Sequence, residues 1–171
     1  RSEMMMYFRS GSLRLSSNLL LAPLAAYTTL PFRLCMREIG GFGLATTELI
    51  HARSLLERKK KALELAQTCP EDNPLAVQLF GAVAEELRDA AQILEAEGVA
   101  VIDINMGCPS KSVAASGSGA ALIKTPDLAH AIVRAARKGL EDWAGGQSIH
   151  SQGFKPSRIE FIHTLNHSRS G

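Results

Sequence analysis

Cys108 has the residue type and the position best suited to chemistry in this sequence. It lies between Gly107 and Pro109, at the start of a loop that follows an apolar run ending at Ile104. A cysteine in such a place is expected to be accessible, and its thiol can donate a proton near neutral pH. The alternative is that Cys108 is a small buried hydrophobe, the usual fate of a free cysteine. Spacing alone leaves both interpretations open.

Asn105 precedes Cys108 and offers both a donor and an acceptor, as recognition of an imide edge requires. Three other apolar runs also end in polar or conformationally special residues. These ends read Ala-Pro-Leu-Ala at 22–25, Thr-Thr-Glu at 46–48 and Gln-Leu-Phe-Gly at 78–81. In parallel α/β sheets the reactive groups gather at the carboxyl ends of the strands. The sequence therefore predicts one functional rim built from four strand ends.

Short apolar runs alternate with longer segments of helical period, and this predicts alternating strands and helices. The expected strands are 19–22, 44–49, 75–80 and 99–104, and the expected helices are 31–39, 52–67, 83–97 and 126–139. Such alternation implies right-handed crossovers and a parallel sheet. Four βα units occupy about 138 residues, whereas a closed eight-stranded barrel takes about 250. We therefore expect an α/β fold, a partial (β/α)₈ TIM barrel of about four βα units.

Each expected helix has an apolar stripe and a stop signal. Gly40-Gly41, Gly98 and Lys138-Gly139 are expected to end the first, third and fourth helices. The stripes are Phe32, Cys35, Met36 and Ile39; Leu55, Leu56, Ala62, Leu63 and Ala66; Val83, Leu87, Ala90, Ala91 and Leu94; and Leu128, Ala131, Ile132 and Ala135.

The composition is that of an ordinary globular domain. The chain has 171 residues, 46% of them hydrophobic, and a formal net charge of +2, which is too weak to indicate a nucleic-acid partner by itself. Three irregularly spaced cysteines suit a reducing compartment, so we expect a cytoplasmic protein. The run from Leu19 to Ala26 imitates a secretory signal, but it is short and contains Pro23, so a buried first strand is the better interpretation.

Three segments are expected along the chain: an N-terminal extension at 1–18, the half barrel at 19–139 and a divergent tail at 140–171. The tail is rich in Ser, His, Gly and Arg, so poor order or a short helix is expected there. His150, His163 and His167 have no convincing partner at ligand spacing, and no metal site is predicted.

The sequence resembles the tRNA-dihydrouridine synthase family from about residue 19 to residue 138. The run D-I-N-M-G-C-P at 103–109, followed by Lys111 and G-x-G-A-A-L at 117–122, resembles the family signature. L-A-P-L-A-A-Y-T-T-L-P-F-R at 21–33, T-E-L-I at 47–50 and V-Q-L-F-G at 77–81 resemble its first three strand ends, in order and at fitting intervals.

The resemblance implies an FMN-dependent enzyme whose flavin is reduced by NADPH. The flavin passes a hydride to C6 of a flipped-out tRNA uridine while a cysteine protonates C5. Transferred to this sequence, Cys108 would be the proton donor and Asn105 would hold the uracil.

The resemblance also implies a set of flavin contacts. Pro23, Leu24 and Ala25 would line the flavin through backbone contacts, and Gln78 would hydrogen-bond the isoalloxazine ring. Glu48 would contact the ribityl chain or act indirectly.

The family's later barrel strands, its phosphate cradle and its helical tRNA-binding domain have no counterpart in this chain. We therefore expect this chain to bind FMN weakly and to reduce tRNA poorly. One alternative is a non-catalytic half barrel that self-associates through its open edges. Another is a different flavin barrel that reduces a free pyrimidine.

Two further motifs favour ordinary interpretations. The run Arg58–Lys61 could touch tRNA phosphates, but a charge run on a helix is usually a solvated face. Gly117-Ser118-Gly119 resembles a phosphate-binding loop, yet it lacks the full glycine fingerprint and is expected to serve a backbone turn.

Overall fold

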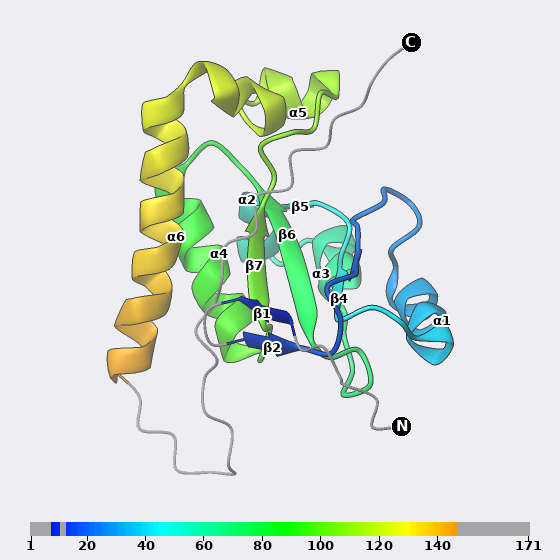
Figure 1. Cartoon of the computed structure of the whole chain (residues 1–171). Helices are drawn as coiled ribbons and strands as arrows, with labels where there is room; N and C mark the ends of the chain where they lie inside the picture. Colours follow the sequence, from blue (N-terminus) through cyan, green and yellow to red (C-terminus); the bar gives the residue numbers. More distant parts are fainter. Residues whose placement is uncertain (1–7, 11–12, 147–171) are drawn as a thin grey trace.

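A computed structural model describes residues 8–10 and 13–146 of the chain, and Figure 1 shows its elements. In chain order these are β1 (Phe8–Ser10), β2 (Leu13–Leu15), β3 (Leu20–Leu21), α1 (Leu30–Ile39), β4 (Leu44–Thr46), β5 (Ile50–His51), α2 (Ala52–Leu56), α3 (Lys60–Ala66), β6 (Leu75–Phe80), α4 (Ala84–Ala96), β7 (Val101–Ile104), α5 (Lys111–Ala115), the 3₁₀ helix η1 (Gly119–Lys124) and α6 (Pro126–Gly146).

The main sheet is parallel and follows the order of the chain. β3 pairs with β4, both β4 and β5 pair with β6, and β6 pairs with β7. Thr46 lies opposite Ala76 and Ile50 opposite Leu79, so the β4–β5 segment has one more residue than β6 between these pairs. β4 and β5 are therefore one strand interrupted by a bulge. The predicted parallel α/β fold with four strand segments is confirmed.

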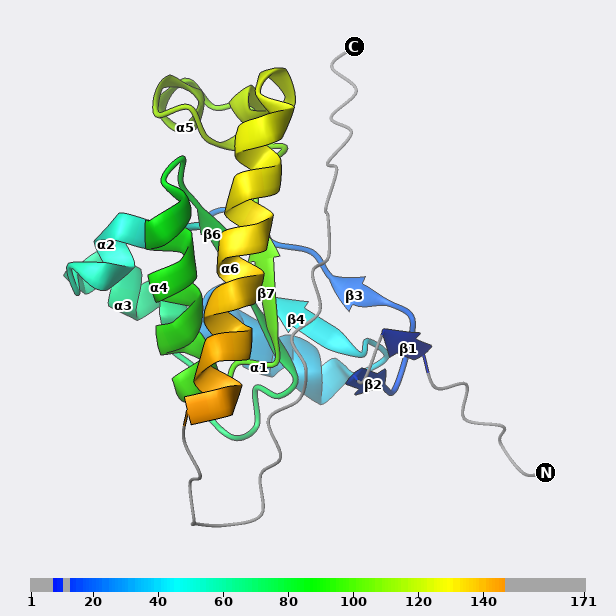
Figure 2. The same ribbon diagram turned by 90° about the vertical axis from the view of Figure 1, so that its left-hand side faces the viewer.

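Successive side chains along each strand point to opposite faces of the sheet, and both faces are buried. Leu75, Val77 and Leu79 of β6 pack with the helices in one cluster, whereas Ala76 packs in a second cluster with Leu44 and Val101. In Figure 2, α4 and α6 lie on one side of β6 and β7, and the hairpin of β1 and β2 lies on the other. This two-faced burial explains why the strands read as nearly unbroken apolar runs.

The N-terminal segment contributes to the core on the side away from the helices. β1 and β2 form an antiparallel hairpin, and Leu13 and Leu15 of β2 are buried against Leu44, Ala76 and Val101. These three partners lie at the beginnings of β4, β6 and β7. The hairpin therefore covers the amino-terminal end of the sheet's inner face.

Helix α1 begins and ends as predicted but buries a different residue. Pro31 lies in its first turn and Gly40 ends it with φ of 78°. Cys35 is exposed, Ile39 is 77% exposed, and the buried residue of the helix is Arg33. The expected apolar stripe is thus largely solvent-facing, because Arg33 rather than Ile39 packs inward.

The predicted helix over 52–67 is wrong, because the chain forms two helices there. Arg58 has φ of 52°, a left-handed conformation that ends α2, and α3 starts at Lys60. The break leaves Leu55 and Ala62 both buried and the cationic run 58–61 exposed. No glycine or proline marks the break, so no residue type at this position indicated it.

Helix α6 continues to Gly146, beyond the predicted end at Lys138 and Gly139. Gly139 is a packing residue, because a Cβ there would lie 2.7 Å from Arg88 Cγ and 3.0 Å from Arg88 O on α4. Gln92 Nε2 donates to Gly139 O at 3.1 Å across the same contact. Leu140 is buried, so the core extends past the predicted boundary.

Smaller differences concern individual positions. Val83 precedes α4 and is 39% exposed, and Ala131 is exposed, whereas both were expected inside. The segment between β7 and α6, predicted as a loop, contains α5 and η1. No helix in residues 8–10 and 13–146 is long and apolar enough to cross a membrane.

Candidate active site

The strand period places three polar residues on the inner face of the sheet. Gln78 is two residues after Ala76 on β6, and Asp103 is two residues after Val101 on β7, so both share the face of the inner apolar cluster. Gln78 and Asp103 are direct partners in the register, and each is 3% exposed. Asn105 follows Asp103 with the same spacing. These side chains therefore lie side by side at the carboxyl end of β6 and β7.

Hydrogen bonds connect these residues to the cysteine. Gln78 Nε2 donates to Asp103 Oδ2 at 2.7 Å, and Asn105 Nδ2 donates to Gln78 Oε1 at 3.1 Å. Asn105 Oδ1 then accepts the backbone N–H of Cys108 at 2.9 Å and that of Gly107 at 3.3 Å. We call this chain of hydrogen bonds the amide relay. It runs from the side chain of Asp103 through those of Gln78 and Asn105 to the backbone N–H of Cys108.

The loop carrying Cys108 is held from its other side by the glycine-rich segment. Ala120 N donates to Cys108 O at 3.0 Å. Gly119 has φ of 60°, and a Cβ there would lie 2.6 Å from Cys108 O. The segment thus approaches the backbone of Cys108 more closely than a side chain allows, which confirms the predicted role of these glycines in a backbone turn. Cys108 itself is half-buried and unbridged.

Hydrogen bonds also join the other strand ends to this group. Thr47, in the bulge between β4 and β5, accepts the Gln78 backbone N–H on its Oγ1 at 3.1 Å. The next residue, Glu48, accepts the Ala26 N–H on its Oε2 at 2.6 Å. Ala26 lies in the loop after β3, so the four strand ends are connected in sequence. The structure therefore brings Glu48, Gln78, Asn105 and Cys108 to one rim.

The loop after β3 presents apolar side chains to solvent and keeps its own backbone occupied. Leu24 is 48% exposed, and Ala25 is exposed beside it. Leu24 N donates to Thr28 Oγ1 at 3.1 Å, and Leu24 O accepts from the N–H groups of Tyr27 and Thr28. The backbone N–H and carbonyl of Leu24 are therefore engaged within the loop, and the expected flavin contact of Leu24 stays a prediction.

Comparison with known proteins places most of this region in one family. The family model described as dihydrouridine synthase matches residues 20–143. The chain belongs to the dihydrouridine synthase family. A probable tRNA-dihydrouridine synthase of Rhodobacter capsulatus is 41% identical over 125 residues, covering 72% of this chain and 38% of that protein. The tRNA-dihydrouridine synthase B of Vibrio vulnificus is 36% identical over 126 residues, covering 73% of this chain and 38% of that protein.

The chain spans about two fifths of the length of these curated relatives. For a probable tRNA-dihydrouridine synthase of Rickettsia bellii the match covers 40% of the relative, at 36% identity. The family match includes all four parallel strand segments and helices α1 to α4. The dihydrouridine synthase fold of this chain is accordingly a partial TIM barrel, as predicted.

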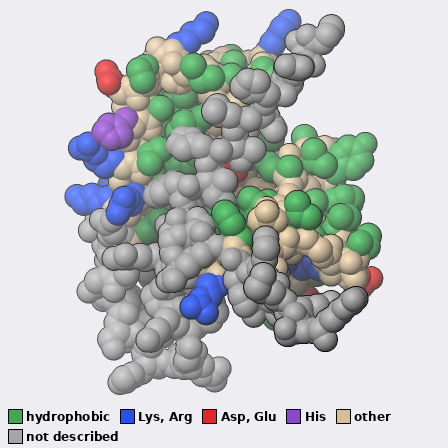
Figure 3. Space-filling model, viewed as in Figure 1, with side chains coloured by type: hydrophobic (Ala, Val, Ile, Leu, Met, Phe, Trp, Pro, Cys, Tyr) green, Lys and Arg blue, Asp and Glu red, His purple; other side chains and the backbone are tan. Residues whose placement is uncertain are grey.

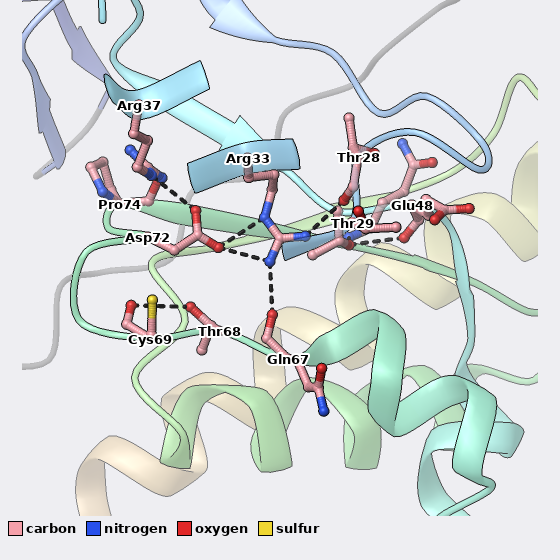
Figure 4. Close-up of polar contacts among 12 residues, drawn as sticks. Thr28, Thr29, Arg33, Arg37, Glu48, Gln67, Thr68, Cys69, Asp72 and Pro74 are labelled. Atoms are coloured by element: carbon pink, nitrogen blue, oxygen red, sulfur yellow. Dashed lines mark hydrogen bonds and ion pairs between the residues drawn. The ribbon is translucent and has the colours of Figure 1, made fainter. Parts of the chain in front are cut away.

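Arg33, Arg37 and Asp72 form a buried ion-pair network that contacts the loop after β3 (Figure 4). This network was not predicted from the sequence. Arg33 and Asp72 have fully buried side chains, and Arg33 Nε and Nη2 donate to Asp72 Oδ2 at 2.8 and 2.7 Å. Arg33 Nη1 also donates to Thr28 O at 2.7 Å, and Nη2 donates to Gln67 O at 2.7 Å. Arg37 Nε donates to the other oxygen of Asp72 at 2.9 Å.

This network links the loop after β3 to the loop before β6. Thr28, whose carbonyl binds Arg33, is the residue whose hydroxyl holds Leu24. Arg33 stood inside the family-like run at 21–33, but no charge pattern indicated that it would be buried. The sequence signal for Asp103 was better, because it shares its strand period with Val101 and Asn105.

A hollow of about 490 Å³ lies at the amino-terminal end of β6 and β7, the end of the sheet opposite the rim. It is lined by residues that begin β6 and β7 or precede them, namely Thr68, Cys69, Pro70, Asp72, Asn73, Leu75, Glu97, Gly98 and Val99. None of the predicted site residues lines it. His150, His163 and His167 lie outside the described residues.

Proposed function

We propose that this chain takes part in the FMN-dependent reduction of uridine to dihydrouridine in tRNA, with Cys108 as the proton donor. Family membership supports the class of reaction. The observation that carries the proposal is the amide relay, which holds the backbone of the half-buried Cys108 at the rim of a parallel sheet.

The chemistry divides between cofactor and protein. When bound, reduced FMN, regenerated by NADPH, would supply the hydride to C6 of the pyrimidine. Cys108 would donate the thiol proton to C5, and the resulting thiolate would regain a proton from solvent. A positioned acid of this kind typically contributes about 10²- to 10⁴-fold in rate.

The residues at the rim fit a flavin unequally. The exposed side chains of Leu24 and Ala25, with Pro23 before them, offer an apolar surface that suits a planar ring. Gln78 fits less well, because it is 3% exposed and both ends of its amide are engaged, leaving one amide hydrogen for the ring. Glu48 fits an indirect role, since its carboxylate holds the Ala26 N–H of the flavin-facing loop.

Exposed cations beside the rim support tRNA as the partner. Lys111 on α5 and Lys124 on η1 are exposed, and His130, Arg134 and Lys138 follow at intervals of four residues along α6, all exposed. Arg134 and Lys138 are like charges four residues apart, and such a pair weakens an isolated helix by about 0.2–0.5 kcal/mol. Figure 3 shows cationic side chains along the α6 flank and at the end of the molecule that carries α5. Such a row suits a phosphate backbone.

A second candidate function is self-association of a half barrel. Figure 3 shows hydrophobic side chains gathered over α1 and the loop before it. Leu19, Tyr27 and Ile39 are 63%, 64% and 77% exposed, and β3 has a partner on one side only among the described strands. A second copy that paired with this edge would cover these side chains.

The other expectations remain predictions. The described residues supply four parallel strand segments, and weak FMN binding and slow turnover by the 171-residue chain stay predictions. Reduction of a free pyrimidine lacks a specific observation in its favour. A reducing, cytoplasmic environment is supported by the three free cysteines.

The test is reconstitution of the purified chain with FMN, NADPH and unmodified tRNA, followed by mass analysis of the nucleosides. We expect flavin absorbance that saturates at high FMN and slow, flavin-dependent formation of dihydrouridine. A light-scattering mass measurement on the same sample reports self-association. A colourless chain that forms oligomers and yields no dihydrouridine would favour the second candidate over the first.

A further inference from the structure

We infer that Asp103 is a positioning residue that fixes the orientation of the Cys108 loop through Gln78 and Asn105. Its value to catalysis rests on the proposed function, whereas its effect on the loop does not. Asp103 bonds to Gln78, Gln78 bonds to Asn105, and Asn105 accepts the Cys108 N–H, so the link from Asp103 to the loop runs through these two amides.

The direction of every bond in the relay follows from the carboxylate. Asp103 Oδ2 accepts from Gln78 Nε2, and this turns Gln78 Oε1 toward Asn105. Asn105 must then turn Nδ2 toward Gln78, which leaves Oδ1 facing the N–H groups of Gly107 and Cys108. Without an acceptor at position 103, the Gln78 amide could rotate by half a turn and lose its bond to Asn105 Nδ2, and Asn105 would then be held only by the loop itself.

Burial gives this orientation its strength. Asp103 and Gln78 are each 3% exposed and lie on the face that carries Ala76 and Val101 one step earlier along the strands. Hydrogen bonds are stronger in such surroundings, and a buried polar network that is left incomplete is costly. An apolar pair at 78 and 103 would pack on this face without such a cost.

The relay also limits what Asn105 can offer a pyrimidine. Its Oδ1 accepts two backbone N–H groups, and one hydrogen of Nδ2 goes to Gln78. One amide hydrogen is left for a ligand. Asn105 therefore meets a carbonyl oxygen of the base and not its imide N–H, which narrows the role expected from the sequence.

The test is Asp103→Asn in the full 171-residue chain, without flavin or tRNA. We expect faster hydrogen exchange at residues 105–109 and alkylation of Cys108 faster by about fivefold, the effect of losing one net hydrogen bond. Peptide mass analysis separates Cys108 from Cys35 and Cys69. Exchange at Val77 and Ile102, in the centres of β6 and β7, should stay as in the parent.

Thr47→Val is the matched control. It removes a buried hydrogen bond to the same Gln78, but at its backbone N–H and outside the relay. We expect lower overall stability and unchanged local exchange at 105–109. Asn105→Ala removes the last link directly and should loosen the loop at least as much as Asp103→Asn.

Equal exchange and alkylation in Asp103→Asn and the parent would overturn the inference. If Asp103→Asn unfolds the whole chain, Asn105→Ala decides: a tight loop in that variant also overturns it, and a loose loop in an otherwise intact sheet supports it. Since no turnover is measured, the result stands apart from the success or failure of the proposed reaction.

Discussion

At the scale of single residues, the side-chain amide of Asn105 and the glycine-rich segment limit the movement of the Cys108 backbone from opposite sides. Asn105 accepts its N–H, and Ala120 donates to its carbonyl oxygen. Gly119 makes the second contact possible because it brings no side chain. The thiol is therefore carried by a backbone segment with little freedom, which is what a proton donor needs to meet one carbon of a bound base.

Gly119→Ala should disturb this arrangement more than Gly117→Ala. Both glycines have positive φ, at 60° and 74°, so both substitutions introduce backbone strain of about 1–3 kcal/mol. An added Cβ at 119 would also lie 2.6 Å from Cys108 O, whereas at 117 it would lie 3.5 Å from Ala82 Cβ, an ordinary contact. Urea unfolding should show the larger loss for Gly119→Ala, together with faster Cys108 alkylation. Equal alkylation in both variants would contradict the proposed contact.

Glu95 on α4 should make stability depend on pH. Burial raises the pKa of its carboxyl above the ordinary 4.5, and its Oε2 is buried without a hydrogen-bond partner among the described residues. A raised pKa means that the folded state is favoured below pH 4.5 and loses stability as pH rises through the folded value.

Glu95→Gln should therefore raise the free energy of unfolding at pH 7 and leave it unchanged near pH 4. The gain should be below about 1 kcal/mol, since the side chain is partly solvated. Glu97→Gln is the control and should change stability little at either pH, because Glu97 is the exposed C-cap residue of α4, two positions after Glu95. A gain for Glu95→Gln that persisted unchanged at low pH would contradict this account.

At the scale of elements, the network of Arg33, Arg37 and Asp72 fixes α1 against the loop before β6. Asp72→Ala should cost about 3–5 kcal/mol, because it leaves a fully buried guanidinium without its charge partner. The exposed pair of Arg53 and Glu86 is the matched control, and Glu86→Ala should cost less than about 1 kcal/mol. Comparable losses in urea unfolding for the two variants would show that the buried pair stabilises α1 no more than a surface pair does.

The elements also show how far the sequence could be interpreted. The short, nearly unbroken apolar runs predicted the buried strands, and the order of polar strand ends predicted which residues would share the rim. Helix ends were harder to predict. Gly139 is of the residue type that often ends a helix, but here it allows close packing against Arg88. The break at Arg58 has no glycine or proline.

The burial of the charged residues Arg33 and Asp72 was not predicted from the sequence. Arg33 lies in a helix whose apolar residues were predicted to face the core. Its partner Asp72 lies 39 positions further along the chain. Local spacing cannot report a contact between residues so far apart. Asp103 was visible as a polar strand end, yet its connection to Cys108 depends on the pairing of β6 with β7.

At the scale of the whole molecule, the cationic row that starts at Lys124, the last residue of η1, and continues along α6 should govern tRNA binding. The triple variant Lys124→Ala, Arg134→Ala, Lys138→Ala should weaken binding by at least about tenfold at low salt and reduce the salt slope by up to about 3. The measurement is tRNA affinity at several salt concentrations.

Lys59→Ala, Lys60→Ala, Lys61→Ala removes the same number of charges from the turn and helix after α2. Lys59 and Lys60 pair with Glu57 and Glu64 there, so this control should change affinity little. Equal losses in the two triple variants would indicate attraction by net charge alone and would contradict a specific role for the α6 row.

The most direct measurement of the central claim is dihydrouridine formation by Cys108→Ala compared with Cys69→Ala, under saturating FMN and NADPH with long incubation. Cys69 lies at the opposite end of the sheet, beside the hollow, and serves as the matched thiol control. We predict that Cys108→Ala keeps flavin binding and loses about 10²- to 10⁴-fold in rate, while Cys69→Ala keeps both. Equal rates in the two variants would contradict the assignment of Cys108 as the proton donor.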